Sequence, residues 1–347
     1  MDISAYFKIA TKKNASDLHL VAGSVPALRI GGDLIKIDEN KIDNNELKEA
    51  IKVLIGEKSW ARFKRKLEMD ISREFFGARF RVNLHYQEGK IALSARVIPS
   101  DAPEPSQINF SEIIYRMTHL RDGLILVTGP SGSGKSTTLA VMLNIINKER
   151  RAHIITIEDP IEYLFKEDQS IIEQRELGKD TKSFASALKY ALRQDPNIIM
   201  VGEMRDTETI SSALTAAETG HLVISTLHTS TAPETIARIV DVFPSHQHEQ
   251  ILNLLSSTLR GVIAQQLLPK IGGGLVAARE IMINNSAIAN LIRRNQIGQI
   301  YSVIQTSYKE GMITMNKSID LLYADGLITE EVAKNRKRDL DTKAIYY

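Results

Sequence analysis

The sequence predicts an α/β domain built on a parallel sheet with helices on both faces, preceded by a small α+β domain. The chain has 347 residues, more than one typical domain needs. Its second part alternates short β-branched strands with helices, the pattern of a covered parallel sheet. Between the parts, residues 99–105 hold three prolines, which fix φ and remove amide donors. We therefore expect domains at 1–98 and 111–347, joined by a proline-rich linker at 99–110.

The first domain shows mixed periodicity. Apolar residues at helical spacing predict helices over 3–11, 46–55 and 58–67. Alternating residues predict strands over 17–21, 27–37, 70–76, 79–86 and 91–98, with the second range folded around the turn at Gly31 and Gly32. The later strands alternate as half-buried antiparallel strands do. This predicts a small α+β domain.

The second domain alternates its elements regularly. Strands are expected at 123–128, 154–157, 198–201 and 222–226, and helices at 136–147, 184–192 and 207–218. Beyond about Thr231 we expect mostly helix.

Composition excludes several classes. The net charge of +2 and the single tryptophan, Trp60, give no basic channel or stacking groove for nucleic acid. The chain has no cysteine, which rules out disulfides, a thiolate nucleophile and cysteine-ligated zinc. No apolar run approaches the ~20 residues that span a bilayer, and residues 1–10 do not resemble a signal peptide. We expect a cytoplasmic protein without direct membrane insertion.

The segment GPSGSGKS at 129–136 matches the phosphate-binding loop pattern and lies between an expected strand and an expected helix. Glycines let backbone amides converge on phosphates, and the helix N-terminus favours negative charge. Lys135 is expected to reach the β- and γ-phosphates, and Ser136 to bind Mg²⁺. The expected ATP-binding residues are Gly129, Ser131, Gly132, Ser133, Gly134, Lys135, Ser136 and Thr137. The motif predicts a P-loop ATPase.

Two acidic residues follow expected strands at the edge where α/β sheets bind ligands. Glu158 is expected to hold a metal-bound or attacking water, with a helix cap or a solvated acid as the alternative. Glu203 is expected to orient or deprotonate the attacking water. The preceding residue is Gly202, where most P-loop enzymes place a magnesium-binding aspartate. The alternative for Glu203 is a salt bridge with Arg205.

His228 follows the expected strand at 222–226 on the same edge, a position that suits a sensor of the γ-phosphate or a contact to Mg²⁺ or water. The alternative is a histidine that only fills the core or the surface. In the first domain Arg79 and Arg81 share one face of a strand, and Arg96 lies on the next strand. Arginine is the usual extra clamp on a transferred phosphoryl group. Taken alone, these three arginines are more simply an exposed basic face.

Several motifs together resemble the secretion-ATPase superfamily, and within it the type IV pilus retraction ATPases, the PilT family. They are the phosphate loop, TIEDPIE at 156–162, VGEMRD at 201–206 and ALTAAETGH at 213–221, with ASDLHL at 15–20, RFRVN at 79–83 and KIGGG at 270–274. The resemblance implies a PAS-like first domain, a RecA-like second domain and a homohexameric ring with ATP between subunits. It also implies that Arg79, Arg81 and Arg96 reach the phosphates, within one subunit or across two.

The resemblance further implies a role and its partners. The family's motor disassembles pilin filaments at the inner face of the inner membrane, through a polytopic platform protein, and a sister pilus ATPase is a further expected partner. Assembly and type II secretion ATPases usually carry a longer N-terminus and a four-cysteine zinc insert, so their absence favours retraction.

One motif departs from the family. The retraction motif AIRNLIRE reads AIANLIRR at 287–294, with Ala289 and Arg294 at the changed positions. Both changes alter the charge of an expected surface helix. An accessory retraction paralogue and a nucleotide-gated regulator of a sister motor therefore stay open as alternatives.

Overall fold

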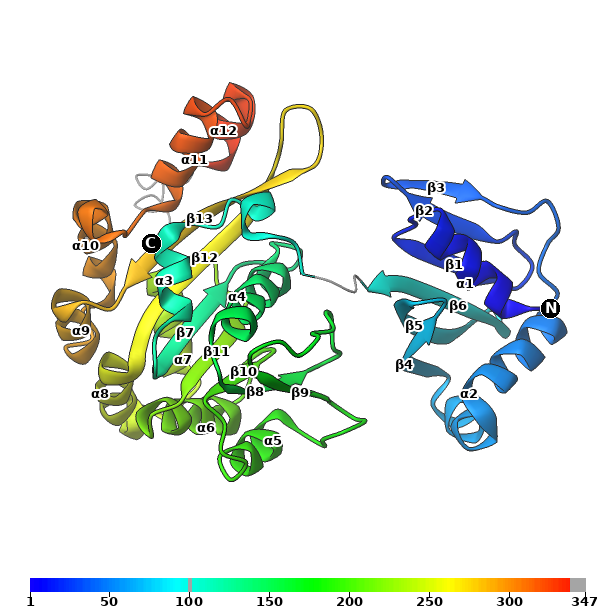
Figure 1. The fold of residues 1–347 in the computed structure, drawn as a ribbon, viewed down its shortest axis with the longest axis horizontal. Helices are drawn as coiled ribbons and strands as arrows, with labels where there is room; N and C mark the ends of the chain where they lie inside the picture. The colour runs from blue at the N-terminus through cyan, green and yellow to red at the C-terminus, as the bar shows by residue number, and fades with distance from the viewer. Residues whose placement is uncertain (99–101, 338–347) are drawn as a thin grey trace. The chain divides into compact units, whose positions relative to one another are not determined.

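A computed structural model describes residues 1–98 and 102–337 (Figure 1). The chain divides into two compact units, an N-terminal one that ends at Asp101 and a C-terminal one that begins at Ala102. Within the described residues, no helix has both the length and the apolar character that crossing a membrane requires.

The N-terminal unit is an antiparallel sheet with two helices. Among the described residues the strand order is β3-β2-β1-β6-β5-β4. The strands are β1 (Asp17–Val21), β2 (Ala27–Ile30), β3 (Asp33–Lys36), β4 (Glu68–Phe75), β5 (Ala78–Gln87) and β6 (Lys90–Ile98), and the helices are α1 (Ile3–Lys12) and α2 (Asn44–Lys66). These elements lie close to the predicted ranges.

Local sequence explains the two helices. The carboxylate of Asp2 caps the first turn of α1, and that of Asp43 caps α2. Gly56 has non-helical angles inside α2 (φ 77°, ψ 161°), so the chain breaks where two separate helices were predicted. Apolar residues of both helices pack with Phe80, Val82 and other inward residues of the sheet.

The C-terminal unit contains a seven-stranded sheet in the described residues, in the order β13-β12-β7-β11-β10-β8-β9. All neighbouring strands are parallel except β12 and β13. The strands are β7 (Gly123–Thr128), β8 (His153–Glu158), β9 (Ile171–Glu176), β10 (Ile198–Val201), β11 (Leu222–Leu227), β12 (Leu259–Pro269) and β13 (Leu275–Ile283).

Helices cover both faces of this sheet, as predicted (Figure 1). Because side chains alternate along a strand, Leu124 and Leu126 of β7 enter one core, and Ile125 and Val127 enter the other. One core includes α3 (Glu112–Thr118) and α4 (Lys135–Glu149). The other includes α5 (Phe184–Ala191), α6 (Thr207–Glu218), α7 (Ala232–Asp241), α8 (His248–Thr258), α9 (Ser286–Arg293) and α10 (Ile300–Thr306). Two further helices, α11 (Met315–Ala324) and α12 (Glu330–Arg336), pack against β12 and β13.

The expectation of mostly helix beyond Thr231 is confirmed by α7 to α12, but it did not include β12 and β13, which form a long antiparallel pair there. The run at 259–268 is mostly apolar and does not alternate regularly, and such a run fits a buried strand and a buried helix equally well. The turn between the two strands could have predicted the hairpin, because it contains Gly272, Gly273 and Gly274, which all have positive φ. The edge strand β9 was not predicted either, because Glu173, Arg175 and Glu176 obscure the alternation of apolar and polar residues.

The predicted linker contains ordered structure. Pro105–Ile108 forms a 3-10 helix that is capped by Glu104 and followed by Asn109 in the left-handed region. The carbonyls of Ile108 and Asn109 accept hydrogen bonds from Arg279 of β13. Residues 99–101 of the predicted linker lie outside the described residues.

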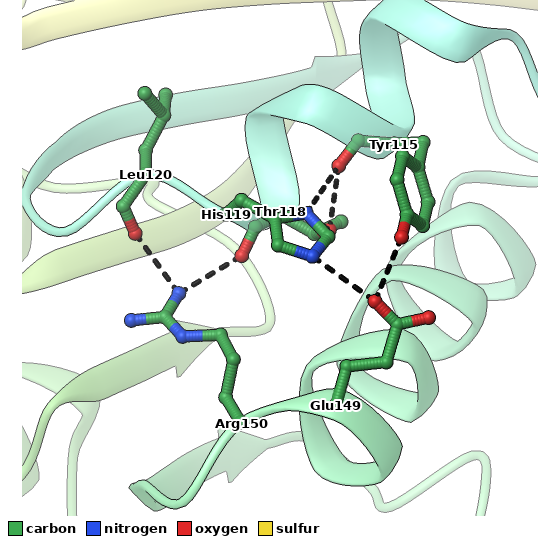
Figure 2. A network of polar contacts seen from close by, with 6 residues as sticks. All are labelled: Tyr115, Thr118, His119, Leu120, Glu149 and Arg150. Carbon is green, nitrogen blue, oxygen red and sulfur yellow. Dashed lines mark hydrogen bonds and ion pairs between the residues drawn. The ribbon is translucent and has the colours of Figure 1, made fainter.

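Figure 2 shows how the C-terminal end of α4 is held against α3. The carboxylate of Glu149 accepts a hydrogen bond of 2.9 Å from the Tyr115 hydroxyl, which raises the pKa of the tyrosine. Nη1 of Arg150 donates to the carbonyls of Thr118 and Leu120, both at 2.9 Å. The helix that follows the phosphate loop is therefore anchored at its far end.

Candidate ATP site

Four neighbouring parallel strands bring the predicted groups of the C-terminal unit to one edge of the sheet. In the registers, Thr128 of β7 pairs with Leu227 of β11, Ser225 of β11 with Val201 of β10, and Val201 with Ile157 of β8. The phosphate loop and His228 directly follow these strands, Glu203 lies two residues beyond one, and Glu158 ends another. This is the carboxyl edge, where open α/β sheets bind their ligands.

Glycines shape the phosphate loop. Gly129, Gly132 and Gly134 have φ of 142°, 76° and 85°, values that side chains rarely allow. A Cβ on Gly129 would lie 2.3 Å from the Gln265 carbonyl oxygen and 2.6 Å from the Ser133 hydroxyl. The loop therefore presses so closely against β12 that its first position requires glycine.

Lys135 begins α4 and is buried. Its Nζ donates to the carbonyl oxygens of Gly129 at 2.9 Å and Pro130 at 3.0 Å. The ammonium therefore lies at the mouth of the loop, beside the backbone that would surround a phosphate. Ser136 and Thr137 follow it in the first turn of α4, both half-buried. At this helix end backbone amides and the helix dipole favour an anion.

Glu158 ends β8 and is buried. Its Oε1 accepts hydrogen bonds from the Thr156 hydroxyl at 2.7 Å and from the Gln174 side chain at 3.2 Å. Two neutral donors therefore hold this carboxylate in place, as positioning a water molecule requires. The alternative of a fully solvated acid is contradicted by its burial.

Glu203 lies just beyond β10, with a side chain 16% exposed. Its Oε2 lies 2.6 Å from Nε of Arg205 and 3.5 Å from Nε2 of His228. The salt bridge that we considered as the alternative is thus present. It does not exclude a catalytic role, because the Arg205 side chain is 73% exposed and can move away. A hollow of about 340 Å³ lined by Glu203, Arg205 and His228 opens at this point.

The glycine before Glu203 has a steric explanation. The Gly202 amide donates to the Ile157 carbonyl at 2.8 Å. A Cβ at this position would lie 3.3 Å from that carbonyl oxygen and 3.5 Å from the Cα of Glu158. The close approach of β8 therefore disfavours a side chain where other P-loop enzymes carry aspartate, and Glu158 carries a carboxylate at the end of that neighbouring strand.

The three predicted arginines lie together on one face of the N-terminal sheet. Arg81 of β5 pairs directly with Arg96 of β6, and Arg79 precedes Arg81 by two residues. Nε of Arg96 lies 2.8 Å from Oδ1 of Asp17, which is itself buried. Arg81 and Arg96 are exposed, while Arg79 is half-buried. The face can therefore present positive charge to an anion.

Comparisons with known proteins agree with this geometry. The family model described as "Type II/IV secretion system protein" matches residues 106–279. The Pseudomonas aeruginosa "Type IV pilus retractation ATPase PilT" is 46% identical over 97% of this chain and 98% of its own length. A Neisseria gonorrhoeae "Twitching motility protein" is 45% identical over 93% of this chain and 87% of its own.

The chain belongs to the type II/IV secretion system protein family. A solved structure titled "Crystal Structure of the Pilus Retraction Motor PilT and Bound ADP" superposes with a TM-score of 0.92 at 47% identity, covering 99% of this chain and 98% of that one. The predicted α/β fold, the resemblance to pilus retraction ATPases and the ATPase class are confirmed. The roles given to individual site residues stay predictions.

Two residues beside the loop were not among the predicted site residues. Gln265 of β12 and Arg279 of β13 are buried and hydrogen-bonded to each other at 3.4 Å. Gln265 also bonds with Ser133 and Thr138. Polar residues inside apolar strands would have marked them, but no strand was predicted beyond Thr231, where the chain was expected to be mostly helical.

Proposed function

We propose that this protein is an ATP-hydrolysing motor that powers the retraction of type IV pili. The observation that carries the proposal is the full-length similarity to pilus retraction ATPases. The chain also has a complete phosphate loop, with Glu158 and Glu203 at the carboxyl edge of the sheet. The alignment covers both units, so the N-terminal arginines are included as well as the ATP site.

The phosphate loop binds the nucleotide in this proposal. Backbone amides of the loop and the N-terminus of α4 surround the phosphates, and Lys135 turns from the loop carbonyls toward them. Thr137, in the first turn of α4, contacts the α-phosphate.

Mg²⁺ fits the residues present. Among the described residues, no cluster of three or more histidine or acidic side chains could hold a metal by itself. Mg²⁺ in such enzymes is instead held by phosphate oxygens, water and one or two protein oxygens. The Ser136 hydroxyl is the oxygen placed for this, and Glu158 would act through a water molecule. The ion would neutralise charge on the phosphates.

Glu203 orients and deprotonates the attacking water. For this its carboxylate separates from the exposed Arg205, and His228, which already lies 3.5 Å from Glu203, contacts the γ-phosphate or the water. Arg79, Arg81 and Arg96 would then stabilise negative charge on the transferred phosphoryl group. We propose a homohexamer in which ATP lies between subunits, so that these arginines complete each site.

The motor would act at the cytoplasmic face of the inner membrane through a polytopic platform protein, with a sister pilus ATPase as a further partner. Deleting the gene in its own host tests this. Loss of retraction predicts cells that keep surface pili but no longer twitch, with rescue by the wild-type gene and by Glu208→Gln, an exposed control on α6, but not by Glu203→Gln. A strain that loses its surface pili would instead indicate an assembly ATPase.

The α9 helix favours a second candidate, an accessory retraction motor or a nucleotide-gated regulator. Ile288, Leu291 and Ile292 are buried, whereas Arg293 and Arg294 are exposed at the end of the helix, where the family motif ends in an acid. This surface therefore carries more positive charge. An accessory role predicts that deletion weakens retraction only partly. It also predicts that Arg294→Glu changes twitching while ATP turnover by the purified protein stays the same.

A further inference from the structure

Gln265 contacts the phosphate loop at two positions and the helix that follows the loop at a third. Its Nε2 donates to the carbonyl of Ser133, a buried residue of the loop, at 2.7 Å. Its Oε1 accepts from the Thr138 hydroxyl at 2.9 Å, in the first turn of α4. Its own carbonyl oxygen is the atom against which Gly129 is packed. With only 2% of its surface exposed, this one residue contacts Gly129 and Ser133 of the loop and Thr138 in the first turn of α4.

Arg279 lies beside Gln265, as its partner in the antiparallel pairing of β12 and β13. Its Nε donates to Gln265 Oε1 at 3.4 Å. Its two terminal nitrogens donate to the carbonyl oxygens of Asn109 at 2.6 Å and Ile108 at 2.9 Å. Arg279 therefore joins the segment that leads into the C-terminal unit to the residue that holds the loop.

The buried charge of Arg279 needs an explanation. The side chain is 4% exposed, and within residues 1–98 and 102–337 no carboxylate forms an ion pair with it. Burial lowers the pKa of Arg279 to about 10, so the guanidinium stays charged at neutral pH. Burying a charge against neutral acceptors alone is unfavourable. A neutral side chain would fill this space at less cost if packing were its only task.

The orientation of the Gln265 amide depends on these donors. Arg279 and Thr138 both donate to its oxygen, which leaves its nitrogen facing the Ser133 carbonyl. The reversed amide would place two acceptors against each other and two donors against each other. Gln265 and Arg279 also line a hollow of about 180 Å³ together with Gly134 and Thr137. The pair therefore lies directly beside the loop surface that would bind nucleotide.

We propose that Gln265 and Arg279 are positioning residues for nucleotide binding. Gln265 holds the phosphate loop in its binding conformation, and Arg279 fixes the amide of Gln265 while anchoring the carbonyls of Ile108 and Asn109. Nucleotide affinity then depends on Arg279, although no hydrogen bond joins this side chain to the loop. The inference rests on nucleotide binding within the proposed function and is independent of pilus retraction.

The test is a double-mutant cycle on the full chain, with ADP affinity measured by calorimetry. Gln265→Glu keeps an acceptor for Arg279 and Thr138 but places a carboxylate against the Ser133 carbonyl. We expect it to weaken ADP binding about tenfold, as the loss of about one hydrogen bond predicts. Arg279→Lys keeps the charge but loses the planar fork, and we expect about fivefold weaker binding. Gln266→Glu, the half-buried neighbour, is the matched control and should bind ADP as the wild type does.

The cycle separates positioning from general destabilisation. Because Arg279 acts through Gln265, Arg279→Lys should add little to Gln265→Glu. The KM for ATP should rise in both single variants while kcat stays within about twofold, since neither residue reaches the reacting atoms. Melting temperatures without nucleotide identify any variant that is unfolded. If one of the two single variants is unfolded, Thr138→Val takes its place in the double-mutant cycle. Wild-type ADP affinity in folded Gln265→Glu, or fully additive effects of the two changes, would overturn the proposal.

Discussion

Replacing Gly129 with alanine tests whether the close contact between the phosphate loop and β12 supports nucleotide binding. An added Cβ would lie 2.3 Å from the Gln265 carbonyl oxygen and 2.6 Å from the Ser133 hydroxyl, at a φ of 142°. Contacts below 3.0 Å force atoms to move, and the nearest of these is backbone of a central strand. The loop must therefore shift rather than the sheet.

Gly132→Ala is the matched control. Gly132 also has positive φ, at 76°, but an added Cβ there would meet nothing within 4 Å. Both variants carry the backbone cost of a side chain at positive φ, which is about 1 kcal/mol or more near the left-handed helical region and is larger at Gly129, whose φ of 142° lies beyond that region. Only Gly129→Ala carries the clash in addition. Strained backbone positions cost on the order of 1–3 kcal/mol, so we expect a difference near 2 kcal/mol, or about thirtyfold in ADP affinity.

Isothermal titration of each purified variant with ADP measures this difference, and thermal melting without nucleotide reports whether the fold is intact. The expected result is a folded Gly129→Ala protein that binds ADP about thirtyfold more weakly than Gly132→Ala. Equal affinities in the two variants would refute the argument that packing against β12 sets the loop.

Two further predictions address the arginine face and a helix cap. Arg81→Ala should lower kcat for ATP hydrolysis at least tenfold while ADP affinity changes little, whereas Arg73→Ala, an exposed arginine on β4, should have wild-type turnover. Normal ATP turnover in Arg81→Ala would contradict a catalytic role and indicate that Arg81 is only a solvated surface charge. Asp206→Ala should reduce the free energy of unfolding by about 1 kcal/mol, because Oδ1 of Asp206 caps α6 through the Thr209 amide at 2.8 Å. Asp206→Asn should restore most of the loss in denaturant melts, and equal melts for both variants would contradict the cap.

Local patterns were sufficient to predict much of this fold. The phosphate loop has fixed spacing and a strand and helix on either side, so its place followed directly from sequence. The shared position of the two acidic residues could also be predicted from the sequence, because parallel strands bring their carboxyl ends to one side of the sheet. Glu158, Glu203 and His228 are indeed on that side.

Tertiary features escaped prediction. The strand β12 shows no regular alternation of buried and exposed residues because both of its faces are covered. Its hydrophobic pattern therefore could not distinguish a strand from a helix. Gln265 and Arg279 were therefore missed, since their importance appears only when β12 and β13 pair and bring them beside the loop. The ion pair between Glu203 and Arg205 was recognised as an alternative, but adjacency in sequence could not say that it coexists with His228.

The central claim is that Glu203 activates water for ATP hydrolysis at this edge of the sheet. Magnesium-dependent phosphate release by the purified protein, compared with Glu203→Gln and the exposed control Glu208→Gln, tests it most directly. We predict that Glu203→Gln binds ATP but turns it over at least a hundredfold more slowly, within the range expected for loss of a general base, while Glu208→Gln equals the wild type. Wild-type turnover in Glu203→Gln would contradict the account and move the catalytic role to another group, with Glu158 the first to test.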